Sequence, residues 1–130
     1  MTHPLSPLER LRRSQQQRWL ADRREALAQA LAGTVLSGPG GFLVFLFGSR
    51  ARGDWDGYSD TDLLVVAPTR QQAELLADRL LADGLGDDVI ALSQADWAAA
   101  AESPSPYWRS IRAQAIPLYE RPSPGLAVPG

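Results

Sequence analysis

Apolar residues recur along the chain with two different periods, and these periods predict its first elements. Residues 5–31 follow a spacing compatible with the 3.6-residue period of a helix, and the apolar positions are Leu8, Leu11, Trp19, Leu20, Leu27 and Leu31. Two continuous apolar runs follow, at 42–47 and 61–67, bounded by glycine or proline. Runs of this length predict strands, and the first is expected to be buried on both faces.

The second half of the chain alternates further helices and strands. The predicted elements are helices at 70–83, 94–101 and 104–115, and strands at 88–92 and 116–120. Thr69, Ser93 and Ser103 are the expected N-caps of the three helices, and Gly84 ends the first. The polar stretch 48–59 predicts a loop, with a short helical turn starting near Ser49. The order indicates an α/β (mixed α+β) fold, a small mixed β-sheet flanked by helices.

The length of 130 residues fits one domain built around one core. Residues 1–33 are expected to form an N-terminal helical extension, and residues 34–121 the core of the fold. The proline-rich stretch 122–130 predicts a disordered tail.

Composition narrows the classes of protein that the chain can belong to. Apolar residues make up 45% and charged residues 22%, which is ordinary globular usage. No apolar run approaches the ~20 residues of a membrane-spanning helix, and no secretory signal precedes the first helix. The chain has no cysteine, which excludes disulfides and thiolate metal sites. A cytoplasmic protein without a membrane partner is expected.

Charge is divided unevenly along the chain. Residues 1–31 carry six arginines against three acidic residues, whereas the rest carries seven arginines against twelve. All thirteen basic residues are arginine, which is typical of a compositional bias, but the basic helix would also suit an acidic partner. The net charge of −2 and a pI near 5.3 argue against direct nucleic-acid binding.

The chemistry is concentrated in two short stretches. Asp60 and Asp62 stand two positions apart at the start of a strand and so point to the same face. Two neighbouring carboxylates repel unless a cation lies between them, and hard oxygen ligands with open positions suit Mg²⁺. Gly48 and Ser49 leave the preceding strand in a sharp turn that lets the backbone approach a phosphate. Arg50 and Arg52 add positive charge, and a binding role is favoured for Arg52.

Together these stretches resemble a known family. The pattern Gly48-Ser49, Ala51-Arg52-Gly53 and Ser59-Asp60-x-Asp62-Leu63 is similar to the signature of the DNA polymerase β-like nucleotidyltransferase superfamily. It looks most like the minimal nucleotidyltransferase (MNT) domains, which often pair with HEPN proteins as antitoxins. The resemblance covers roughly residues 42–121 and implies the nucleotidyltransferase fold, with the N-terminal helix as an extra element.

The resemblance also implies the members of the site. Asp60, Asp62 and a third carboxylate would be catalytic and hold Mg²⁺, while Gly48, Ser49 and Arg52 would bind the nucleotide, ATP. Asp88 is the expected third carboxylate and Asp87 the alternative; neighbouring residues of a strand face opposite ways, so only one can join the site.

Three functions remain open at this point. The resemblance favours a protein adenylyltransferase, an antitoxin that transfers AMP from ATP to a tyrosine of a HEPN ribonuclease toxin. The second is an antitoxin that neutralises its toxin by sequestration, with the basic helix as the contact. The third is a small-molecule nucleotidyltransferase of the antibiotic-modifying type. A homo-oligomer is compatible with each of them.

Overall fold

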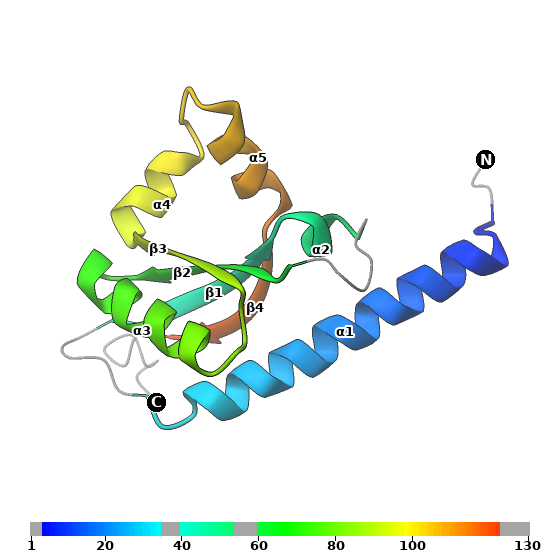
Figure 1. The fold of residues 1–130 in the computed structure, drawn as a ribbon. Helices are drawn as coiled ribbons and strands as arrows, with labels where there is room; N and C mark the ends of the chain where they lie inside the picture. The colour runs from blue at the N-terminus through cyan, green and yellow to red at the C-terminus, as the bar shows by residue number, and fades with distance from the viewer. Residues whose placement is uncertain (1–3, 35–39, 54–59, 123–130) are drawn as a thin grey trace, which may run out of the picture.

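A computed structural model describes residues 4–34, 40–53 and 60–122 of the chain. Its centre is a four-stranded sheet in the order β3-β2-β1-β4, with α1 and α3 on one face and α4 and α5 on the other (Figure 1). The elements are α1 (Pro7–Leu31), β1 (Phe42–Phe47), α2 (Ser49–Arg52), β2 (Asp62–Ala67), α3 (Arg70–Ala82), β3 (Asp88–Ser93), α4 (Gln94–Ala100), α5 (Pro106–Gln114) and β4 (Ile116–Arg121). The predicted mixed α+β fold is confirmed.

The sheet is mixed because its connections differ. β1 runs antiparallel to both β2 and β4, whereas β2 and β3 are parallel and joined by the crossover helix α3. β3 and β4 form the two edges. Pro117 lies in β4, and an edge strand is where a sheet tolerates a residue without a backbone N–H. The crossover brings the first residues of β2 and β3 to the same end of the sheet.

The core lies on both sides of β2, whose residues Leu63 to Ala67 are at most 1% exposed. Leu63 and Val65 pack with α1 and α3, and Leu64 and Val66 pack with α4 and α5. β1 is less evenly covered, because Leu43 and Phe45 stay partly exposed on the α4 and α5 side. We expected the strand at 42–47 to be buried on both faces. In the structure β2 is buried on both faces, whereas β1 is fully buried on one face and partly exposed on the other.

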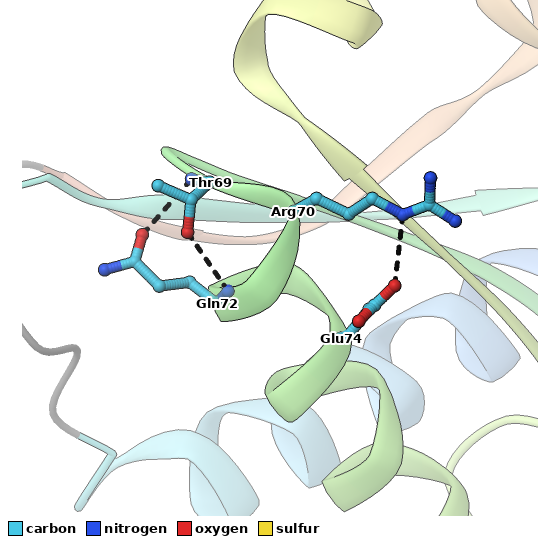
Figure 2. Close-up of polar contacts among 4 residues, drawn as sticks. All are labelled: Thr69, Arg70, Gln72 and Glu74. Carbon is cyan, nitrogen blue, oxygen red and sulfur yellow. Dashed lines mark hydrogen bonds and ion pairs between the residues drawn. The ribbon is translucent and has the colours of Figure 1, made fainter.

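The ends of α3 follow the sequence prediction. The Thr69 hydroxyl accepts a hydrogen bond from the Gln72 amide (3.2 Å), and the Gln72 side chain accepts one from the Thr69 amide (3.2 Å). This reciprocal pair satisfies two backbone donors at the helix start, and an Arg70–Glu74 ion pair of 3.0 Å follows (Figure 2). Gly84, at φ +71°, reverses the chain after the helix. Ser93 likewise caps α4 by accepting from the Asp96 amide.

The predicted start of α5 is wrong. The helix begins at Pro106 and not at 104, and its N-cap is Ser105 rather than Ser103. The physical reason is that Ser105 precedes a proline, which disfavours the helical conformation at that residue. The Ser103 hydroxyl instead accepts a hydrogen bond from the Ser105 amide (3.1 Å).

The fully buried residues of α1 lie in its second half. Leu27 and Leu31 are fully buried, whereas Leu8 and Leu11 are 60% and 54% exposed, so the apolar spacing predicted the helix but not which of its positions are buried. The N-terminal half of the helix runs past the sheet (Figure 1). Arg121 of β4 donates to the Leu31 carbonyl (2.7 Å) and fixes the other end.

None of the helices in the described ranges is both long and apolar enough to cross a bilayer. The expected loop at 48–59 and the expected disordered tail at 122–130 lie partly outside the described residues.

Candidate active site

The acidic residues meet where β2 and β3 begin. Asp62 is the register partner of Asp88 in the parallel pair, and partners of this kind project from the same face of a sheet. Asp62 shares that face with Leu64 and Val66, so the pair lies on the α4 and α5 side of the sheet. Asp60 precedes β2 by two residues and is exposed, as is Asp88, whereas Asp62 is partly buried. The site therefore has an inner carboxylate and two outer ones.

The electrostatics of Asp62 reflect this position. Burial raises the pKa of its carboxyl group above the ordinary value, and the negative charges of Asp88, Asp60 and Asp87 raise that pKa further. The positive charge of Arg52 acts in the opposite direction. Without a cation, the ionised form of Asp62 is thus disfavoured by its acidic neighbours.

Asp87 has a different task from Asp88. Its carboxylate accepts a hydrogen bond from the Thr61 amide (2.7 Å), and the Asp87 amide donates to the Thr61 carbonyl (2.9 Å). Thr61 is only 4% exposed, so this exchange satisfies buried backbone between Asp60 and Asp62. Asp87 holds the start of β2 in place, while Asp88 lies beside Asp62.

The turn after β1 lies beside Asp62. Phe47 pairs with Asp62 in the antiparallel ladder, so Gly48 follows directly beside the inner carboxylate. Gly48 has φ +78° and ψ −157°, a conformation that is essentially restricted to glycine. A Cβ atom at this position would overlap Oδ2 of Asp62 and lie 3.3 Å from its Cγ. The glycine is thus required both by the backbone and by the close approach of the turn to Asp62.

The turn is closed by α2, which carries Ser49 and two arginines. The Arg52 amide donates to the Gly48 carbonyl (3.1 Å) and the Gly53 amide to the Ser49 carbonyl (3.0 Å). Arg52 is exposed and close enough to affect Asp62. The Arg50 guanidinium instead lies over the ring of Trp19, 4.7 Å from the ring centre, with its Nε and Nη1 atoms buried. Arg50 and Arg52 are two positions apart in the same short helix, but Arg50 packs on Trp19 whereas Arg52 is exposed near Asp62.

The donor set fits Mg²⁺ as an open site. All the candidate ligands are carboxylate oxygens, which this ion prefers, and the Gly48 backbone leaves room beside Asp62. Within residues 4–34, 40–53 and 60–122, no three acidic or histidine side chains are gathered closely enough to form a metal cage on their own. Asp60, Asp62 and Asp88 all lie in these ranges, so the described geometry does not by itself gather them into a three-ligand site. A magnesium ion held by some of them would complete its coordination with water and substrate phosphates. Ser59, the first residue of the acidic motif, lies outside the described residues.

A separate hollow of about 440 Å³ opens between β3, α4 and α5, and residues from Leu92 to Trp108 line it. Leu92 pairs with Val66, at the opposite end of β2 from Asp62. No predicted site residue lines this hollow, and we therefore place the chemistry at the acidic edge.

Sequence reasoning did not single out α1 as part of this region. Gln16 donates through Nε2 to the Arg50 carbonyl, and Trp19 lies under the Arg50 guanidinium. In the sequence, the one sign of a contact in this part of α1 was Trp19 among polar residues, and an isolated tryptophan indicates packing rather than a role in the site.

An acidic pair at the start of a strand, beside a glycine turn on a mixed sheet, defines a protein of the nucleotidyltransferase fold. The profile of the nucleotidyltransferase domain family matches residues 31–98, more than half of the chain, and the chain belongs to this family, within the polymerase β-like superfamily. The match includes the Gly48 turn and all four acidic residues. No curated protein and no solved structure matches the chain.

Proposed function

We propose that the chain is a magnesium-dependent nucleotidyltransferase in which Asp60, Asp62 and Asp88 hold the metal. Family membership supports nucleotidyl transfer as the general reaction. The observation that carries the assignment of residues is the parallel register of Asp62 with Asp88, with Gly48 against the same carboxylate. This register and this close approach support a single site built from both halves of the motif.

The residues divide the work by position. Asp62, the inner carboxylate, and Asp60 would hold the metal that accompanies the triphosphate. Asp88 would help to hold metal and would accept the proton of the attacking hydroxyl. Gly48 and Ser49 form the surface against which the phosphates lie, and Arg52 supplies positive charge beside them. Bound Mg²⁺ would neutralise charge that develops on the phosphate oxygens and the leaving pyrophosphate. The hydroxyl attacks the α-phosphorus, the bond to the β-phosphate oxygen breaks, and pyrophosphate leaves.

The proposed nucleotide is ATP and the proposed acceptor is a tyrosine of a HEPN-type ribonuclease toxin, which makes the chain an antitoxin. The support for this acceptor is the resemblance of the motif to MNT domains. The exposure of Asp60 and Asp88 is compatible with it, because a side chain on a protein surface can reach an acid that is open to solvent.

The test is transfer of label from α-phosphate-labelled ATP to a purified HEPN protein in the presence of Mg²⁺. Asp62→Asn and Asp88→Asn should each lower the rate by at least about 100-fold, because preorganised charge is lost at the transition state. Asp87→Asn is the matched control: it removes the neighbouring charge but keeps an oxygen that can accept from the Thr61 amide, and its rate should stay within about threefold.

The outcomes separate the alternatives. Equal losses in the Asp87 and Asp88 variants would show that Asp88 has no special position. No label with the wild type, together with a tight complex that protects against the toxin, would replace the enzyme by a sequestering antitoxin. Label on an aminoglycoside-type small molecule, and none on the protein, would replace the acceptor.

A further inference from the structure

The N-terminal helix α1 contacts α2, the turn after β1, through a residue that precedes the family match at 31–98. Gln16 Nε2 donates a hydrogen bond to the backbone carbonyl of Arg50, in the middle of α2. Gln16 is partly buried, although it stands in a run of three glutamines whose other members, Gln15 and Gln17, are exposed. Burial and this hydrogen bond distinguish Gln16 from two chemically identical neighbours.

A tryptophan one turn further along α1 lies between two arginines. The guanidinium carbon of Arg50 is 4.7 Å, and that of Arg23 is 5.0 Å, from the ring centre of Trp19. Contacts at this distance are attractive because the ring face is negative. Trp19 itself packs against the main hydrophobic core. The ring thus links α2 to the body of the domain.

The second arginine continues the link to the acidic strands. Arg23 Nη1 donates to the Leu85 carbonyl (2.9 Å), in the segment that leads into β3. Burial and the charge of Arg50 lower the pKa of Arg23, while Asp87 raises it, which places Asp87 close by. Asp87 in turn accepts from the Thr61 amide, next to the inner carboxylate. One helix therefore connects the turn after β1 with the start of β2 and β3.

We propose that three residues of α1, Gln16, Trp19 and Arg23, are positioning residues that hold the α2 turn against the acidic strand ends and so set the affinity for the nucleotide. The three do not contact the phosphates; they act through the backbone of Arg50 and through the segment before β3. We call these contacts of Gln16, Trp19 and Arg23 the brace. The inference rests on the proposed function for its nucleotide, but the brace is a property of the ligand-free chain.

The physical argument is one of preorganisation. α2 has four residues, too few to hold its own shape, because a single helical turn costs more ordering entropy than its hydrogen bonds return. The turn must nevertheless keep Gly48 beside Asp62. Contacts from a 25-residue helix that is anchored on β4 supply the missing restraint.

The test compares Gln16→Ala with Gln17→Ala, and Trp19→Leu with Trp19→Phe. The first readout is hydrogen exchange of the Arg52 and Gly53 amides, which close the turn, in the absence of nucleotide and metal. Gln16→Ala should speed their exchange about three- to tenfold, the loss expected for one hydrogen bond to a carbonyl, and Gln17→Ala should leave it unchanged. Trp19→Phe, which keeps a ring face, should exchange more slowly than Trp19→Leu.

The second readout is the dissociation constant of ATP with Mg²⁺. It should rise in Gln16→Ala relative to Gln17→Ala, and in Trp19→Leu relative to Trp19→Phe, by no more than the factor seen in exchange. The melting temperature of Gln16→Ala should lie only a few degrees below that of Gln17→Ala, because the same hydrogen bond is lost from the native state. Unchanged exchange in both brace variants overturns the brace whether or not ATP binds. Faster exchange with unaltered ATP affinity overturns the positioning role. A wild-type chain that binds no ATP overturns the proposed function, and the exchange result still decides the brace.

Discussion

Replacement of Gly48 by alanine tests the close approach of the turn to the inner carboxylate. The backbone at Gly48, φ +78° and ψ −157°, costs any other residue about 1–3 kcal/mol. The added Cβ would also overlap Oδ2 of Asp62. The Asp62 side chain must then leave its preferred rotamer, at a cost of about 0.5–1.5 kcal/mol. Gly48→Ala should therefore lower the free energy of unfolding by about 1.5–4.5 kcal/mol.

Two further variants separate these contributions. Gly53 also has positive φ, +80°, but a Cβ there meets nothing within 4 Å, so Gly53→Ala should cost only about 1–2 kcal/mol. In an Asp62→Ala background the nearest remaining atom to a Cβ on residue 48 is the Asp62 Cβ, at an ordinary 3.5 Å. The cost of Gly48→Ala should then fall by about 0.5–1.5 kcal/mol, which is the coupling energy of the pair.

The assay is urea unfolding of the four variants of this double-mutant cycle and of Gly53→Ala, with chelator present and a common slope required. Additive costs for Gly48→Ala and Asp62→Ala would refute the overlap. A Gly48→Ala variant as stable as the wild type would refute the backbone argument as well. ATP binding provides a second check, because Gly48→Ala should weaken it and Gly53→Ala, whose added methyl points into open space, should weaken it less.

Two other predictions concern stability. The pKa of Asp62 is raised in the folded chain, so the folded state binds the proton more tightly and stability is lost as pH rises from near the usual 3.8 through the raised value. Metal-free Asp62→Asn should therefore be more stable than the wild type at pH 7 and lose this advantage toward pH 3. The measurement is the urea midpoint of both proteins at the two pH values. Equal midpoints at pH 7 would contradict the raised pKa of Asp62. Thr69→Ala removes the cap of α3 and should cost about 1 kcal/mol, whereas Ser105→Ala, at a cap position without a side-chain hydrogen bond, should change thermal stability by less than about 0.5 kcal/mol.

Local signals in the sequence were sufficient for most elements. The apolar run at 42–47 has the bounds of β1, and Thr69 and Ser93 cap their helices as expected, because strand periodicity and capping depend on residues within a few positions of each other. The expectation that Asp60 and Asp62 share one strand was not met, because β2 begins at Asp62 and Asp60 precedes it. The prediction at Ser103 failed for a local reason too, since the two prolines shift the cap by two residues.

Tertiary structure alone decided which distant residues share the site. The sequence determined that a glycine turn, an Asp-x-Asp strand and one of two further acids belong to this chain. The parallel register of β2 and β3 puts Asp88 beside Asp62 and assigns Asp87 to the Thr61 backbone. The packing of α1 turns Arg50 toward Trp19 and leaves Arg52 near the acids. Such choices depend on burial between segments 26 to 34 positions apart, and no local pattern encodes the pairing of segments so far separated.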